Sequence, residues 1–123
     1  MEVAIDSHAL LWYLSKNNKL STRARDTLDK SSKIIVSVIV ILELLYILKK
    51  FGKERQFSDL LKSLGSEKYL IYPVDLALVR ECAKFSKNLE MHDKLICATA
   101  KLFKAPLVTK DEEIGSVYKS VVW

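Results

Sequence analysis

Short apolar runs alternate with longer stretches of helical periodicity along this chain, and that alternation is the strongest constraint on its fold. Runs of this kind, each followed by an amphipathic stretch, predict parallel strands joined by helices. We expect strands at residues 2–5, 33–36, 69–73 and 107–109, with a fifth at 120–123. Helices then cover both faces through right-handed crossovers. The prediction is a three-layer α/β/α fold with a parallel sheet of four to five strands.

Residues suited to helix N-caps stand at the starts of the intervening segments. They include Ser7, Ser37 and Asp75. In the helix after Asp75 we expect Val79 to face the core, and Gly52 to end the helix that starts at residue 38. A loop at residues 87–92 precedes the last predicted helix, 93–104.

Bulk properties limit the remaining choices. At 123 residues and 14.1 kDa the chain suits a single domain, residues 1–123. A net charge of +5 and a pI near 9.2 favour RNA, DNA or an acidic peptide as partner. Cys82 and Cys97 fall in apolar patterns and are predicted to be reduced. The N-terminus does not resemble a signal peptide and no apolar run is long enough to cross a bilayer, so we expect a cytoplasmic protein without membrane contact.

Two acids follow predicted strands. Asp6 ends the first strand and Asp111 follows the fourth. Parallel α/β sheets bind ligands beyond the carboxyl ends of their strands, where the strand order reverses. The alternative for each acid is a helix cap, which is the stronger alternative for Asp111, because Ser7 is available to cap the helix after Asp6.

Glu43 is the only charged side chain between residues 38 and 48. A helix that is apolar all round is expected to be buried on most sides, and a carboxylate there needs a cation or a raised pKa. A salt bridge to lysine or arginine is the alternative. Lys50, about 10 Å along the helix axis, is too far away for a direct pair.

Asp93 shares a helix face with Ile96, Cys97 and Ala100, so it is expected to point toward the packed side. The alternative is an acid that caps or stabilises the first turn. Glu90 is expected in the preceding loop, contributing at most indirectly.

Acids on separate elements repel one another unless a cation lies among them. Oxygen donors favour Mg²⁺ or Mn²⁺. Zinc is disfavoured because His8 and His92, like the two cysteines, lack ligand spacing. Both histidines are expected to be structural or supporting residues.

In four segments the sequence resembles a PIN domain of the VapC toxin type. The segments are VAIDSHALLWYL, SVIVILELLYIL, MHDKLICATAKLF and PLVTKDEEI. The resemblance implies a sheet in order 3-2-1-4-5 and an acidic metal-binding quartet with hydroxyl support from Ser7 and Thr109. The quartet is Asp6, Glu43, Asp93 and Asp111. The segment MHDKL departs from many relatives, which leaves the roles of Glu90 and Lys94 open.

The function expected from the quartet is a Mg²⁺- or Mn²⁺-dependent endoribonuclease. The resemblance implies that it is the toxin of a type II toxin–antitoxin pair. The resemblance also implies an antitoxin bound in grooves between early helices, a homodimer, and products with a 5′-phosphate and a 3′-hydroxyl. Candidate phosphate contacts are Lys50, Lys94 and Lys110. The alternatives are a catalytically silent PIN-like interaction module, a receiver-type signalling domain and, less favoured, an aspartyl-phosphate hydrolase.

Overall fold

The computed structural model describes residues 1–85 and 88–123, and its elements alternate as the sequence pattern predicts. Their bounds are β1 (Glu2–Ile5), α1 (Ser7–Leu14), α2 (Thr22–Lys30), β2 (Lys33–Ser37), α3 (Val38–Lys50), the 3-10 helix η1 (Glu54–Gln56), α4 (Phe57–Leu64), β3 (Tyr69–Tyr72), α5 (Leu76–Cys82), α6 (Met91–Leu102), β4 (Leu107–Val108), α7 (Glu112–Val117) and β5 (Val121–Val122).

All five strands form one parallel sheet in the order β3-β2-β1-β4-β5. The chain builds β1, β2 and β3 outward in one direction and then crosses back to place β4 on the free side of β1. In the register of that pair, Ile5 lies beside Val108. The strand order therefore reverses between β1 and β4, and the predicted fold class and strand order are confirmed.

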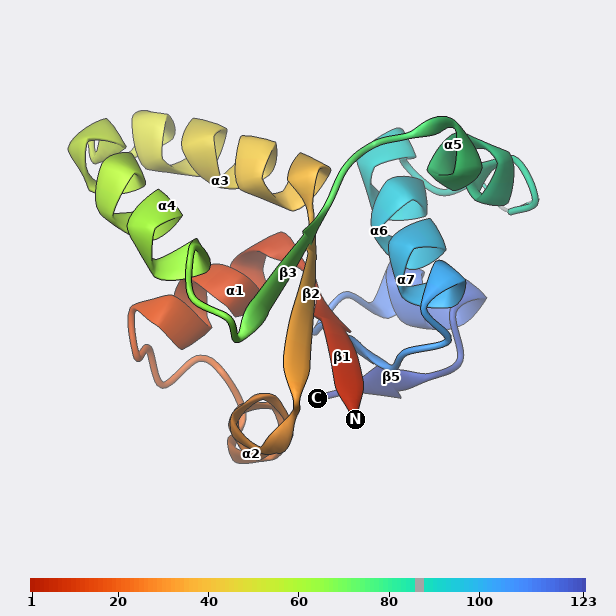
Figure 1. Ribbon diagram of the computed structural model, residues 1–123, viewed down its shortest axis with the longest axis horizontal. Helices are drawn as coiled ribbons and strands as arrows, with labels where there is room; N and C mark the ends of the chain where they lie inside the picture. Colours follow the sequence, from red (N-terminus) through yellow and green to blue (C-terminus); the bar gives the residue numbers. More distant parts are fainter. Residues whose placement is uncertain (86–87) are drawn as a thin grey trace.

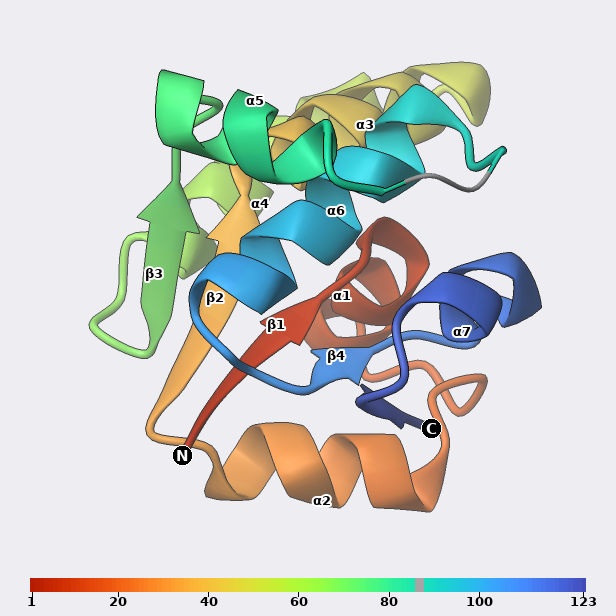
Figure 2. The same cartoon turned by 90° about the vertical axis from the view of Figure 1, so that its right-hand side faces the viewer.

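Helices cover both faces of the sheet, which gives three layers (Figure 1). Helices α1, α3 and α4 lie on one side, and α5, α6 and α7 on the other; α2 lies across the end where the strands begin (Figure 2). The strands read as nearly continuous apolar runs because both of their faces are buried. Ile5, Ile34, Ile35 and Leu107 are fully buried between the layers. With α2 at the amino end, the carboxyl ends of the strands are left open for a site.

Helix caps follow the predicted residues at two of three starts. The Ser37 hydroxyl accepts a hydrogen bond from the Ile39 N–H at 3.3 Å, and Asp75 caps α5. Gly52, just past the end of α3, has a φ of +66°, a conformation that glycine adopts without strain. The prediction for Ser7 was wrong, because Asp6 caps α1 and Ser7 is the first helical residue.

Helix α6 begins earlier than predicted, at Met91, with Glu90 as its N-cap. Asp93 therefore lies within the first turn. The predicted loop at residues 87–92 includes residue 87, which lies outside the described residues; of its remainder, 91 and 92 are helical. No helix in the described part of the chain is long and apolar enough to cross a membrane.

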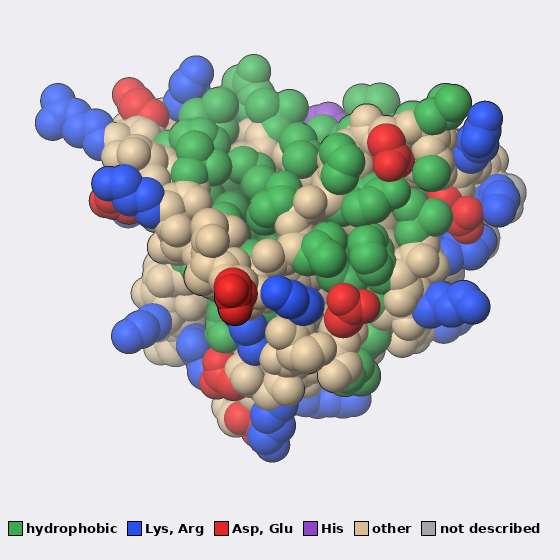
Figure 3. All heavy atoms as spheres, viewed as in Figure 1, with side chains coloured by type: hydrophobic (Ala, Val, Ile, Leu, Met, Phe, Trp, Pro, Cys, Tyr) green, Lys and Arg blue, Asp and Glu red, His purple; other side chains and the backbone are tan. Residues whose placement is uncertain are grey.

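Val79, which we expected in the core, is 48% exposed on α5. Helix α3, which we expected to be buried on most sides, has an exposed face that carries Val38 and Leu42. Figure 3 shows hydrophobic side chains gathered around β3 and the adjoining ends of α3 and α5. We call six exposed residues of this region the β3-edge patch: Val38, Leu42, Ile71, Val74, Leu76 and Val79. The apolar pattern of these helices serves an outer surface as well as the core.

Candidate active site

All four predicted acids line one pocket of about 140 Å³ at the carboxyl end of the sheet. Asp6 comes from the end of β1, Glu43 from α3, Asp93 from α6, and Asp111 from the segment after β4. The whole lining is Asp6, Ser7, His8, Glu43, Ile47, Asp93, Ile96, Asp111 and Ile114. Four distant segments of the sequence thus bring carboxylates to the point where the strand order reverses.

Asp6 is 8% exposed, and both of its carboxylate oxygens accept hydrogen bonds. Oδ1 accepts the Ala9 N–H at 3.0 Å, which caps α1, and Oδ2 accepts the Thr109 hydroxyl. Burial raises the pKa of Asp6 above its ordinary value of 3.8, while these two hydrogen bonds act in the opposite direction. Each oxygen still has a second lone pair, so the carboxylate can cap the helix and bind a cation.

Thr109 joins the ends of β1 and β4. Thr109 is 1% exposed, and its hydroxyl donates to Asp6 and accepts the Asp111 N–H at 3.0 Å. One buried hydroxyl therefore fixes the Asp6 side chain relative to the backbone that carries Asp111. The resemblance assigned Thr109 a supporting role, and these contacts are consistent with it.

Glu43 is held from two sides. The Ser7 hydroxyl donates to Glu43 Oε1 at 2.5 Å, and His92 Nδ1 lies 3.6 Å from Oε2. His92 also lies 3.9 Å from a Glu90 oxygen and donates its backbone N–H to the Glu90 side chain at 2.9 Å. In residues 1–85 and 88–123 no lysine or arginine forms an ion pair with Glu43. The alternative of a lysine or arginine salt bridge to Glu43 therefore finds no support in the described contacts.

Asp93 experiences the combined charge of the site. Burial first, and then the carboxylates of Asp111, Glu90, Glu43 and Asp6, raise its pKa to about 6. Its neighbours along the helix face, which include Ile96 and Cys97, are buried. Near neutral pH the pocket therefore gathers negative charge at an energetic cost, and a cation would lower that cost.

Asp111 also caps a helix. Its Oδ1 accepts the N–H groups of Glu113 and Ile114 at 2.8 and 3.2 Å. Asp111 is therefore the N-cap of α7, as the capping alternative predicts. Because Asp111 also lines the pocket and contributes to the raised pKa of Asp93, capping does not account for all of its surroundings.

The donors suit Mg²⁺ or Mn²⁺ in chemistry, because all four are carboxylates around a small pocket. As the side chains are placed, no group of three or more His, Cys, Asp and Glu among the described residues is close enough to hold a metal ion. The chemistry of these side chains therefore suits a hard divalent cation, while in the structure they are spread around the pocket.

A family model of the PIN domain matches residues 3–120, a span that contains the four acids. The chain belongs to the PIN domain family. This membership, together with the confirmed strand order, removes the receiver-type domain as an alternative. As a PIN domain, the chain carries its acidic pocket at the β1/β4 junction described above.

Solved structures share this PIN fold at low sequence identity. A chain of VapBC2 from Rickettsia felis, bound to a promoter DNA fragment, has a TM-score of 0.72 at 18% identity, with 98% of this chain and 96% of that chain covered. FitAcB from Neisseria gonorrhoeae has a TM-score of 0.70 at 18% identity, with 98% of this chain and 96% of that chain covered. VapBC-5 from Mycobacterium tuberculosis, a member of a family of toxin–antitoxin systems, has a TM-score of 0.66 at 17% identity, with 98% of this chain and 94% of that chain covered. No curated protein matches the chain. At these identities the likeness establishes the fold.

The three predicted phosphate-contacting lysines lie in different places. Lys110 lines an opening beside the acids, with Asp6 and Asp111. Lys94 lines an apolar pocket with Val79 instead. Lys50 is exposed in the last turn of α3, past the acid pocket. Of the three, Lys110 is the one placed beside the predicted quartet.

The sequence reasoning missed the aromatic side of the site. Trp12 lines the opening that contains Lys110, and its ring centroid lies 5.8 Å from that of His8 and 5.9 Å from that of Trp123. The i, i+4 spacing of His8 and Trp12 could have paired these two rings. No sequence signal placed Trp123 beside them, because that contact joins the two ends of the chain.

We predict that Thr109→Val lowers the free energy of unfolding by about 2 kcal/mol, because it leaves a buried Asp6 oxygen and the Asp111 N–H without their partner. Thr109→Ser should retain most of the stability. Urea denaturation measures both. Thr99→Val is the matched control, since the buried Thr99 hydroxyl donates to the Leu95 carbonyl of its own helix. Equal losses for the two valine variants would contradict the bridging role of Thr109.

Proposed function

We propose that this PIN domain is a metal-dependent endoribonuclease, the VapC-type toxin of a toxin–antitoxin pair. The observation that supports it most is the single pocket lined by Asp6, Glu43, Asp93 and Asp111, which come from four separate elements of the fold. The solved relatives with this fold include toxin–antitoxin complexes. A catalytically silent PIN module is the second candidate, and loss of metal binding would favour it.

Each acid has a role that follows from its contacts. Asp6, Asp93 and Asp111 would hold Mg²⁺ or Mn²⁺ with their free oxygen lone pairs, Asp111 either directly or through water. The chemistry supplied by such an ion is polarisation of the scissile phosphate and a lower pKa for a water molecule. Glu43, oriented by Ser7 and His92, would accept a hydrogen bond from the attacking water and align it with the phosphorus.

RNA is the proposed substrate, with products that carry a 5′-phosphate and a 3′-hydroxyl. The net charge of +5 attracts a polyanion, and Lys110 is available for a phosphate near the acids. Cys82 and Cys97 are free thiols, in keeping with our proposal of a cytoplasmic location, where RNA is present and thiols stay reduced.

An antitoxin is the proposed protein partner, and a groove between α1, α3 and α4 fits it. The groove has a volume of about 270 Å³ and a largely apolar wall. Its lining is Leu11, Leu14, Ser15, Leu48, Gln56, Asp59, Leu60 and Ser63. An amphipathic helix binds such a groove through its apolar face. A short reading frame directly upstream, encoding a DNA-binding segment and a disordered tail, would identify this partner.

We also propose that the protein forms a homodimer through the β3-edge patch. An uncovered edge strand flanked by apolar side chains is a site of association. Its six apolar side chains are exposed, and two copies related by a twofold axis could cover them against one another.

Asp93→Asn and Asp6→Asn are each predicted to lower metal-dependent RNA cleavage by about 100-fold or more, because each removes a charged metal donor. The measurement is cleavage of tRNA, rRNA and mRNA by the purified protein with Mn²⁺ or Mg²⁺, with EDTA as the metal-free control. Asp26→Asn, a change on the exposed surface of α2, should leave the rate unchanged. Full activity in both site variants would exclude this mechanism.

Metal affinity is predicted to fall as the pH drops below about 6. The pKa of Asp93 is about 6 in the metal-free protein, so below that value a proton competes with the metal for its carboxylate. The affinity should decrease up to about tenfold per pH unit there and level off above about pH 7. Calorimetric Mn²⁺ titrations from pH 5 to 8 test this. A flat profile that matches Asp93→Asn would show that Asp93 is not a ligand.

Leu76→Asp is predicted to convert the dimer to a monomer, because it places a charge within the apolar patch. Sedimentation velocity at micromolar concentration distinguishes the two states. Phe51→Asp serves as the control, since Phe51 is exposed but lies outside the patch. A wild-type protein that sediments as a monomer would contradict the dimer proposal.

A further inference from the structure

The acid pocket continues into a larger opening of about 490 Å³ between α1 and the start of α7. Its lining is Asp6, His8, Ala9, Trp12, Lys110, Asp111 and Glu112. Three of these residues, Asp6, His8 and Asp111, also line the acid pocket. A molecule in the opening would therefore lie directly beside the proposed catalytic acids.

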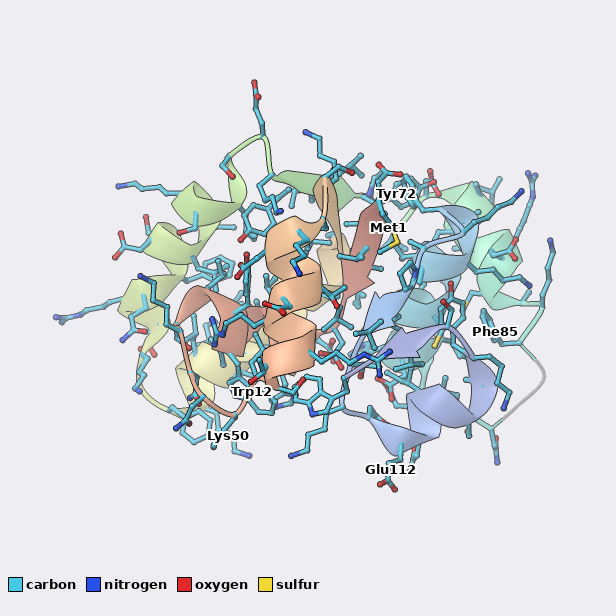
Figure 4. The ribbon with its side chains drawn as sticks, turned by 90° about the horizontal axis from the view of Figure 1, so that it is seen from below. Met1, Trp12, Lys50, Tyr72, Phe85 and Glu112 are labelled. Carbon is cyan, nitrogen blue, oxygen red and sulfur yellow. The ribbon has the colours of Figure 1, made fainter. Side chains whose placement is uncertain are left out.

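One side of the opening is aromatic. His8 and Trp12 lie on successive turns of α1 with ring centroids 5.8 Å apart, and the Trp123 ring meets Trp12 edge-on at 5.9 Å. His8 is exposed and Trp12 is half-buried. Trp123, next to β5, thus supports Trp12 from the far end of the chain. Figure 4 shows Trp12 and Glu112 on the same side of the molecule, one from α1 and the other from α7.

Apart from Ala9, the rest of the lining is charged. Asp6 and Asp111 would be engaged by the proposed metal ion, which leaves Glu112 and Lys110 to face a bound molecule. A neutral, flat group can stack on the indole, and an amino group on it can donate a hydrogen bond to the Glu112 carboxylate. A nucleobase has both properties, and the volume of the opening is in the range of small-ligand sites.

We propose that this opening is a base-binding subsite, in which an unpaired base next to the scissile phosphate stacks on Trp12 while Lys110 contacts the adjoining phosphate. The inference rests on the proposed ribonuclease function and adds a requirement for an unstacked nucleotide at the cleavage site. Single-stranded RNA is commonly bound by stacking of splayed bases on aromatic side chains.

Steady-state cleavage of a labelled single-stranded RNA with Mn²⁺ tests the subsite. Trp12→Leu should raise KM about tenfold or more with a smaller effect on kcat, and Trp12→Phe should restore most of the loss, because stacking is retained. Phe51→Leu removes an exposed aromatic ring elsewhere and should change neither constant. Circular dichroism checks that the variants are folded.

A second measurement does not depend on the folding of a Trp12 variant. In Trp123→Phe combined with Asp93→Asn, Trp12 is the sole tryptophan and the RNA remains uncleaved. Addition of single-stranded RNA should quench its fluorescence, whereas duplex RNA should quench it less.

The outcomes distinguish failure of the base-binding subsite from failure of the ribonuclease proposal. If the wild-type protein cleaves no RNA, the ribonuclease proposal fails. If it cleaves RNA but Trp12→Leu leaves KM unchanged and the lone Trp12 is not quenched, the base subsite is wrong. Should Trp12→Leu weaken only the binding of a partner protein, the opening would accept a protein side chain, such as an arginine stacked on the indole, in place of a base.

Discussion

The bridge made by the Thr109 hydroxyl, between Asp6 and the backbone of Asp111, is the interaction on which the site depends. The register of β1 and β4 places Ile5 beside Val108, which brings the two strand ends together. Register alone leaves the Asp6 side chain free to rotate. The capping bond from Ala9 fixes one carboxylate oxygen and Thr109 fixes the other, so the acid is oriented by the same contacts that begin α1 and end β4. The site is therefore an extension of the sheet topology.

The geometry of the site has an energetic cost, which is offset by the hydrophobic core of the fold. Carboxylates from four elements face one small pocket, and burial together with the neighbouring carboxylates raises the pKa of Asp93. A pocket designed for stability alone would carry apolar or neutral residues, since buried charges without partners destabilise a fold. The buried strands and the core positions of the helices supply the compensating hydrophobic stability. Such a local conflict with the otherwise consistent pattern of the chain is typical of a functional site.

Much of this arrangement could be predicted from the sequence because it follows from short-range patterns. Apolar runs and caps located the strands and most helices, and the position of Asp6 and Asp111 after strands placed them at one edge of the sheet. The errors have physical reasons. Ser7 and Asp6 are both good N-caps, but in the fold the Ser7 hydroxyl donates to Glu43, and Asp6 is oriented by Thr109, more than 100 residues away. Val79 has the periodicity of a core residue, but periodicity does not separate a core from an apolar outer surface. The Trp12–Trp123 contact needs the three-dimensional position of β5, which no local signal provides.

Helix α1 connects the proposed functional surfaces. Leu11 and Leu14 line the groove between α1, α3 and α4, while His8 and Trp12 line the opening beside the acids. The helix has eight residues, which corresponds to a length of about 12 Å and a diameter with side chains of about 10 Å. A partner helix seated in the groove would therefore lie within about one helix diameter of the opening. A few further residues of such a partner could reach the acids, so inhibition of this site would require no change in the fold, only continuation of the bound chain past α1.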